Sequence, residues 1–231
     1  RTFYNLHNMV LAVAGNCTAD QVLEIADELL KPCEDQKLET VFPEESLDIV
    51  RPETVESAAV GQTLFNLGIK IAPKTGYANL KAEMEATIAM QILAGTSSPL
   101  YQKMLQEGYI NSVFSTEVFN GDGFFTMIFG GESREPRMVR KEITEALLNA
   151  QKNGLDEALF AECKKSTYGA LVRELNNVSA VTNALVSAHM AGCGIFDTLH
   201  VLSDMTLEDC NRFLREEVDV QHMTLSMIEP A

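Results

Sequence analysis

The stretch NSVFSTEVFNGDGFFTMIFG, residues 111–130, carries the clearest local signal in the sequence. Two runs, residues 111–119 and residues 123–130, are rich in β-branched and aromatic side chains, and Asn-Gly-Asp-Gly lies around the junction between them. Asparagine and glycine tolerate the positive φ angles of tight turns, so this pattern is typical of a β-hairpin. We therefore predict two antiparallel strands here, with Gly121 and Gly123 serving the turn rather than a phosphate.

Upstream of the hairpin, the sequence predicts one strand followed by two helices. Residues 58–71 mix alternating apolar positions with small residues and predict a strand. Residues 79–94 predict a helix that Gly95 ends, and Pro99 suits the first turn of a second helix that reaches Gly108. The longer helix has apolar residues at every fourth position, namely Leu80, Met84, Ile88 and Ile92.

Downstream of the hairpin the pattern is helical almost to the end. We predict an apolar side on the first of these helices, formed by Met138, Ile143, Leu147 and Leu148. Strands mixed with consecutive helices predict an α+β fold, in which helices are layered on one face of a mixed, largely antiparallel sheet. The expected elements are helices over residues 136–151, 156–176, 179–191 and 206–216 and a strand over residues 222–228.

The first 52 residues differ from the rest. The apolar run at residues 9–15 predicts a buried strand, and Thr18 and Gln21 have the spacing of a capping box that opens a helix. Residues 31–52 hold three prolines and many acids, which indicates an exposed linker. Because the chain starts without Met and opens almost directly into a strand, we expect it to be a piece of something longer.

Composition excludes several classes of partner. With 18 Lys+Arg against 33 Asp+Glu, the formal net charge of −15 repels nucleic acid and anionic membranes. The same charge would attract cationic peptides, although acidic helix faces also serve solubility alone. No apolar run approaches the ~20 residues of a membrane span. We therefore expect neither nucleic acid nor a membrane as partner.

Five scattered cysteines and an ordinary N-terminal sequence favour a cytoplasmic protein. The number is odd, and no pair has the C-x-x-C spacing. A chain of this size does not need disulfides, so a reducing compartment fits best. Residues 1–8 lack the apolar core of a signal peptide.

Catalytic motifs are missing from the sequence. Neither H-x-x-E-H nor H-E-x-x-H occurs, nor does G-x-S-x-G or a glycine-rich phosphate loop. Among the histidines and cysteines, only His189 and Cys193 stand four residues apart, and the apolar neighbours of His189 favour a packed helix end over a metal site. We assign no catalytic residue, no metal ligand and no cofactor to this chain.

Longer segments resemble a known family. Residues 3–16, FYNLHNMVLAVAGN, resemble a late strand segment of the catalytic half of pitrilysin-type (insulinase family) zinc peptidases. Residues 98–110, SPLYQKMLQEGYI, are similar to a helix of the second half of these enzymes. Further matches in the right order are residues 129–131, 135–136 and 153–155. The chain thus looks like the C-terminal half of an M16 peptidase, and is most similar to bacterial insulinase-like members.

The resemblance implies an enzyme of two homologous α+β halves, each with the fold of mitochondrial processing peptidase, that close around a substrate chamber. Zinc would be held by the missing N-terminal half. Residues 1–31 would be the terminal strand and helix of that catalytic half, residues 32–52 a linker, and residues 53–231 the complete metal-free half.

The family also suggests substrate contacts. Its second half often supplies an Arg and a Tyr in the spacing R-x6-Y, and Tyr109 matches the Tyr while Gln102 stands where the Arg would be. Aligning on Gly108 instead puts Leu105 and Asn111 at the two positions. Tyr109 is therefore the substrate-binding candidate, and its alternative role is an aromatic packed at a helix end.

Three functions follow as expectations. The first is the half that positions peptide substrate in a zinc peptidase, inactive by itself, with the N-terminal catalytic half as its partner. The second is half of a non-catalytic partner subunit of an active homologous peptidase. The third is a structural or binding module outside the family. An H-x-x-E-H motif upstream of residue 1 would favour the first over the second.

Overall fold

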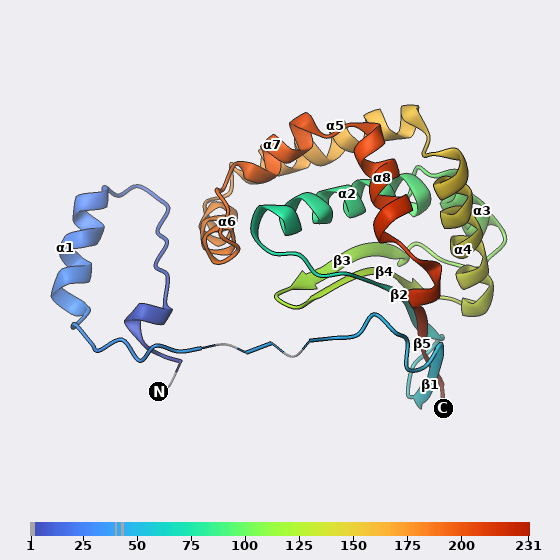
Figure 1. The fold of residues 1–231 in the computed structure, drawn as a ribbon, viewed down its shortest axis with the longest axis horizontal. Helices are drawn as coiled ribbons and strands as arrows, with labels where there is room; N and C mark the ends of the chain where they lie inside the picture. Colours follow the sequence, from blue (N-terminus) through green and yellow to red (C-terminus); the bar gives the residue numbers. More distant parts are fainter. Residues whose placement is uncertain (1–2, 40, 43) are drawn as a thin grey trace.

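The computed structural model describes residues 3–39, 41–42 and 44–231 (Figure 1). Within them, five strands form one sheet in the order β1-β5-β2-β4-β3. Only the β1–β5 pair is parallel among these neighbours. The sheet is therefore mixed and largely antiparallel, as predicted. The strands are β1 (Glu53–Ala58), β2 (Leu64–Ile71), β3 (Ser115–Gly121), β4 (Phe124–Glu132) and β5 (Met223–Pro230).

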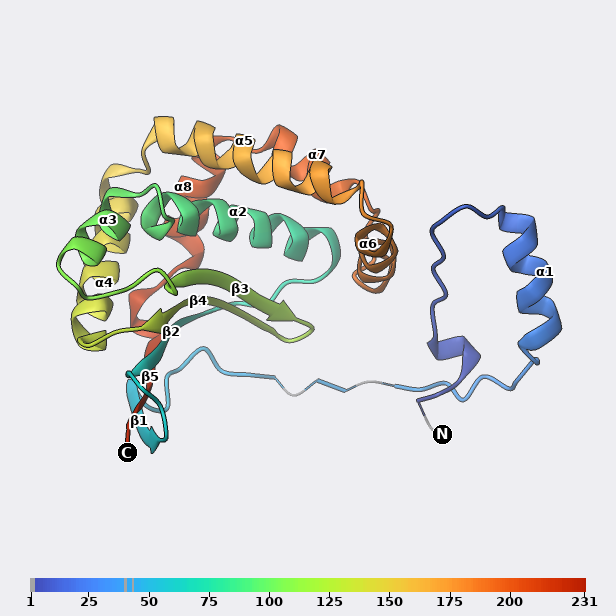
Figure 2. The same cartoon turned by 180° about the vertical axis from the view of Figure 1, so that it is seen from behind.

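Helices cover one face of this sheet (Figures 1 and 2), which confirms the predicted fold class. Two short 3₁₀ turns, Leu6–Asn8 and Val220–His222, are also present. The α-helices are α1 (Ala19–Leu29), α2 (Gly76–Ala94), α3 (Pro99–Gln106), α4 (Pro136–Asn153), α5 (Glu157–Glu174), α6 (Val178–Met190), α7 (Asp197–Asp204) and α8 (Leu207–Glu217).

The core lies between the sheet and α2. Alternate residues of the strands point toward the helices, because side chains change face at every residue of a strand. They meet the central helix α2, which buries Ile88 and Met90, and α8, which buries Phe213. Removal of this apolar surface from water is the main driving force for the fold. The buried strand residues include Phe65, Leu67, Ile69, Phe125, Met127, Phe129 and Leu225.

Capping side chains fix the residue at which several helices begin. Side-chain oxygens of Ser98, Asp156 and Thr206 accept backbone N–H groups at the starts of α3, α5 and α8. Such caps satisfy donors that a helix leaves unpaired in its first turn. The predicted hairpin is also confirmed, with β3 and β4 paired from Ser115↔Gly130 to Gly121↔Phe124. Gly123 has the positive φ of the turn, but the turn role expected for Gly121 is wrong because Gly121 is paired in β3.

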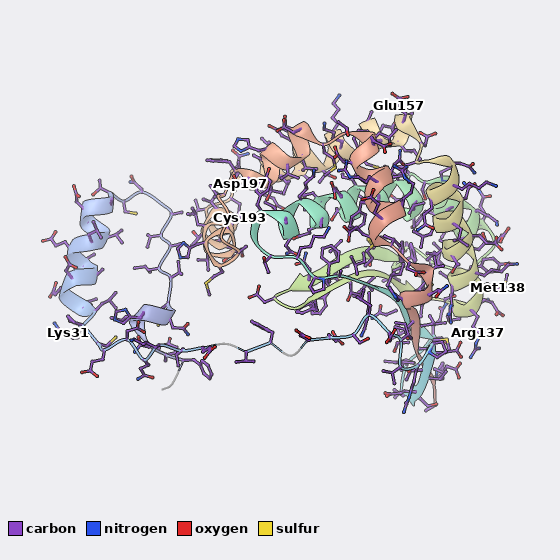
Figure 3. The ribbon with its side chains drawn as sticks, in the orientation of Figure 1. Lys31, Arg137, Met138, Glu157, Cys193 and Asp197 are labelled. Carbon is purple, nitrogen blue, oxygen red and sulfur yellow. The ribbon has the colours of Figure 1, made fainter. Side chains whose placement is uncertain are left out.

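One expected strand is corrected, and one strand and one helix were missed. The strand predicted over residues 58–71 starts only at Leu64, and a separate strand, β1, precedes it. Strand β1 holds few apolar residues because it is an edge strand with exposed side chains. Its Glu53 forms an ion pair at 2.5 Å with Arg137 of α4, and Arg137 is labelled in Figure 3. The short helix α7 was not predicted.

The apolar side of α4 is also corrected. Ile143 and Leu147 are buried as expected, but Met138 is only partly buried and Leu148 is exposed. The helix turns so that positions three to four residues apart face the core, which fits the 3.6-residue repeat. The residues that complete the buried side are Pro136, Val139 and Ala150.

The N-terminal segment stands apart from the sheet and its helices (Figures 1 and 2). The predicted capping box of α1 is confirmed, with Thr18 and Gln21 bonded reciprocally. The strand expected at residues 9–15 is wrong, because no strand is assigned there. A strand needs a neighbour to pair with, and no strand among the described residues pairs with this segment. Asn5 instead donates its side-chain N–H to the carbonyl of Glu34 at 2.9 Å.

The last part of the expected linker contacts the sheet. Lys70 of β2 donates to Glu45 and to the carbonyl of Ser46, both at 3.1 Å. Thr224 of β5 donates to the carbonyl of Arg51 at 2.8 Å. Residues 30–39, 41–42 and 44–52 form no helix or strand. The division into residues 1–31, 32–52 and 53–231 stays a prediction.

Candidate functional site

The sheet has a second face that no helix of the described chain covers, and we call it the open face (Figure 1). Its side chains alternate with those of the core and are exposed or half-buried along β2 and β3. The open face consists of Thr54, Glu56, Leu64, Asn66, Gly68, Lys70, Ser115, Glu117, Phe119, Phe124, Thr126, Ile128, Gly130, Glu132, Thr224, Ser226 and Ile228.

Asn66 lies in the middle of a polar row across this face. It is paired with Ser226 on β5 and with Gly130 on β4, and Gly130 is paired with Ser115 on β3. The side-chain oxygen of Asn66 lies over Gly130, where a Cβ atom would clash with it. The exposed amide of Asn66 can donate and accept hydrogen bonds.

A second row runs beside the first, and its central residue has no side chain. Gly68 of β2 pairs with Thr224 on one side and with Ile128 on the other, and Ile128 pairs with Glu117 on the edge strand. Because Gly68 carries no side chain, a peptide backbone can approach this second row closely. Over Gly130 the space is filled by the Asn66 side chain. Toward the hairpin turn, the rings of Phe119 and Phe124 pack in a tilted arrangement with centroids 4.9 Å apart.

Tyr109 follows α3 and is half-buried against the core. Its backbone is fixed at both ends, since its N–H donates to the carbonyl of Met104 at 2.9 Å and its carbonyl accepts from Ser133 Oγ at 2.5 Å. Burial, with the charge of Glu107 second, raises the pKa of the Tyr109 hydroxyl. The hydroxyl therefore remains a protonated donor at neutral pH. Its role in binding substrate stays a prediction.

The other residues that the family alignment suggested lie in two different places. Gln102 is exposed on α3 and donates to the carbonyl of Thr96 at 2.8 Å, and Leu105 is exposed on the same helix. Asn111 donates to Glu132 at 2.7 Å, which ties the loop after α3 to the open face. No Arg takes part in these contacts. The structure thus brings Asn111, and not Gln102, to the sheet.

His189 lies in the last turn of α6, and Cys193, labelled in Figure 3, follows the helix. His189 is exposed, while Cys193 is half-buried and its thiol faces the carbonyl of Ala191 at 3.6 Å. Burial, followed by the charge of Asp197, raises the pKa of the Cys193 thiol, which disfavours the thiolate that binds metals. Within the described residues no three His, Cys, Asp or Glu side chains are grouped to hold a metal ion. These residues do not fit a zinc site.

Sequence reasoning missed Asn66, although a signal was present. In the run LFNLGIKI, polar Asn66 and Lys70 stand at alternate positions among buried residues, which marks one side of the strand as uncovered. The neighbours of Asn66 across the sheet, Ser226 and Ser115, come from strands far away in sequence. Their meeting depends on sheet order, which no local pattern encodes.

Comparison with known proteins identifies the family. The family described as "Peptidase M16 inactive domain" matches residues 1–167, which is most of the chain. The chain belongs to this family. A relative from Bacillus subtilis (strain 168), described as the uncharacterized zinc protease YmfH, is 27% identical over 238 residues, and the match covers 99% of this chain and 54% of that protein.

Solved structures agree on the fold of this M16 domain. A putative M16-like peptidase from Alicyclobacillus acidocaldarius superposes with a TM-score of 0.87 at 24% identity, over 94% of this chain and 53% of that one. A chain of Complex III2 from Candida albicans gives 0.72 at 16% identity, over 93% and 53%. The chain thus spans about half the length of the relatives it matches.

No helix of the described M16 domain combines the length and the apolar character that crossing a bilayer requires. The compartment of the protein stays a prediction.

Proposed function

We propose that this M16 domain is the metal-free half of a zinc-dependent peptidase, where it closes the chamber and positions peptide substrate. The observation that carries the proposal is the open face, a sheet surface uncovered by helices and bordered by the edge strand β3. Catalysis gains when a substrate is held in a reactive orientation, even by groups that do not take part in the chemistry.

Strand β3 offers backbone groups to an extended peptide. It pairs with β4 on one side only, and no described strand pairs with its other side. An added peptide strand can bind to such an edge through its backbone, while alternate side chains select its sequence. Ser115, Glu117 and Phe119 point onto the open face from this strand. They are the side chains closest to a peptide bound there.

The exposed apolar side chains of the N-terminal segment support the proposal that a second half packs against it. Every buried apolar side chain among the described residues lies at position 65 or later, yet Phe3, Tyr4, Leu11 and Leu29 are exposed. Burial of apolar surface is worth about 25 cal/mol per Å². A segment with this many uncovered apolar side chains is stabilised by packing on another body, for which the N-terminal catalytic half is the proposed candidate.

Charge supports a preference for basic peptides. Glu56 and Glu117 are exposed on the open face, while Lys70 is paired with Glu45 at 3.1 Å. Together with the formal net charge of −15, this arrangement attracts cationic substrates. The preference should weaken with salt, because exposed charges are screened.

The test replaces Asn66 by leucine in the intact parent protein and measures hydrolysis of quenched peptides. A peptide strand paired with β3 is three strand spacings from β2, so Asn66 would bond only a part of the substrate that lies over the open face. Loss of that hydrogen bond should lower kcat/KM about tenfold, equivalent to about 1.4 kcal/mol. Asn149→Leu is the matched control, since Asn149 is exposed on α4, away from the sheet. We expect this control to stay within about twofold of wild type.

Equal activity of wild type and Asn66→Leu would contradict the positioning role of the open face. A wild-type parent protein that shows no chelator-sensitive hydrolysis would instead favour the second function, a non-catalytic partner subunit.

A further inference from the structure

Helix α6 and the turn after it form an unusually uncharged surface. Residues 175–196 contain no Asp, Glu, Lys or Arg, in a chain whose formal net charge is −15. Several apolar side chains there are exposed, with Val178 at 54% and Met190 at 69%, and Leu185 and Phe196 belong to the same set. A helix face that only meets water normally carries charges. We call residues 178–196 the α6 surface.

Packing inside the domain does not explain this composition. No residue of α6 is buried, whereas α2 and α8 each bury several. A hollow of about 100 Å³ separates α6 from α5 and α7, lined mainly by Leu171, Leu175, Ala180, Ala184, Ile195 and Leu199. The apolar side chains of α6 therefore add little to the core, and exposed apolar surface of this kind marks interaction sites.

The position of α6 indicates what covers it. It forms the end of the domain that faces the N-terminal segment (Figures 1 and 2). That segment shares the same character, because residues 3–19 also lack charged side chains and Leu11 and Val13 are exposed. Any body that packs around residues 3–30 thus lies on the α6 side of the domain.

We infer that the α6 surface is the apolar contact through which this half meets the zinc-bearing half, the body on which residues 3–30 pack. The inference rests on the proposed function and names the partner surface. Charges are absent because an unpaired charge buried in such a contact is strongly unfavourable. The loose seating of α6 lets it adjust as the two halves approach.

The experiment compares hydrogen exchange of α6 amides in this chain alone and in the intact parent protein. We expect exchange about tenfold slower or more in the intact protein, since burial of a loosely packed helix suppresses its local opening. The paired change Leu185→Glu and Met190→Glu in the intact protein should abolish the slowing. Leu148→Glu, which alters an exposed leucine on α4, should leave it unchanged.

Equal exchange of α6 in the two wild-type proteins would overturn the inference, and this comparison needs no variant to fold. Slowing that grows with protein concentration would also overturn it, because the contact would then be with a second copy. If α6 exchanges equally while Asn66→Leu still impairs hydrolysis, the α6 contact is wrong and the positioning function stands.

Discussion

The side-chain oxygen of Asn66 occupies the space that a Cβ atom on Gly130 would need. The two residues are paired across β2 and β4, so residue 130 must be glycine for the Asn66 amide to lie in its present place. The backbone carbonyl of Phe65, 3.3 Å from the same point, narrows the space further. The most polar row of the open face thus depends on a missing side chain.

Gly130→Ala should therefore destabilise the domain. The exposed Asn66 amide can turn away, so the remaining cost comes from its displacement and from the Phe65 carbonyl and should be about 1 kcal/mol of unfolding free energy, measurable by urea denaturation. Gly61→Ala is the control, because nothing lies within 4 Å of a Cβ atom there. Adding Asn66→Ala to Gly130→Ala should restore part of the loss. If Gly130→Ala is as stable as Gly61→Ala, the close approach of Asn66 is wrong.

Shortening the chain should locate the start of the folded domain. A chain that begins at Glu44 keeps the bonds from Lys70 to Glu45, from Thr224 to Arg51 and from Leu225 to Pro52, and it should match the full chain in stability. A chain that begins at Glu53 loses all three, which should cost about 1–3 kcal/mol. Calorimetry of the two shortened chains measures this difference in stability. Equal stability of the two shortened chains would show that residues 44–52 do not stabilise the domain.

Asp209 should stabilise α8 above acidic pH. Its carboxylate accepts from the Thr206 hydroxyl and N–H and from Arg212, and these bonds, those from Thr206 first, lower the pKa of Asp209. A lowered folded-state pKa means that stability is full above about pH 4 and is lost as pH falls through the folded value. Asp209→Asn should cost about 1 kcal/mol at pH 7 and less at pH 3. A pH-independent loss would contradict this, and Asp204→Asn is the exposed control.

Glu85 should show the opposite pH dependence. Burial raises its pKa, and Lys81, 3.6 Å away, only partly opposes this. A raised folded-state pKa means that stability falls as pH rises through that value. The unfolding free energy of Glu85→Gln, relative to wild type, should therefore rise between pH 4.5 and pH 7.5. A change of the same sign as for Asp209→Asn would show that Lys81 and Arg212, and not burial, govern Glu85.

Local sequence patterns predicted the elements that depend on near neighbours. The capping box of Thr18 and Gln21 formed as expected. The hairpin also formed, although its turn is Asp122-Gly123 and Asn120 and Gly121 lie in β3. Strand β1 was missed because its identity comes from pairing with β5, where Glu53 meets Leu225. The strand expected at residues 9–15 failed for the same reason, since no partner for it lies in the described chain.

The candidate site was harder to predict than the fold. Tyr109 came from family resemblance alone, and no observation yet tests its role. Asn66, Ser226 and Gly130 form one row only because β2, β5 and β4 lie side by side. The sequence alone was enough to see that no zinc motif is present. Such motifs place their ligands on one turn of helix, so the ligands are only a few residues apart in the sequence.

The most direct test of the metal-free half is hydrolysis of a quenched peptide library by the zinc-bearing half alone, by this chain alone, and by the two mixed, each with and without a chelator. We expect no cleavage by this chain, little by the zinc-bearing half, and chelator-sensitive cleavage by the mixture, because positioning and chemistry come from different halves. Chelator-sensitive cleavage by this chain alone, or a zinc-bearing half whose activity does not change when this chain is added, would contradict the proposed function.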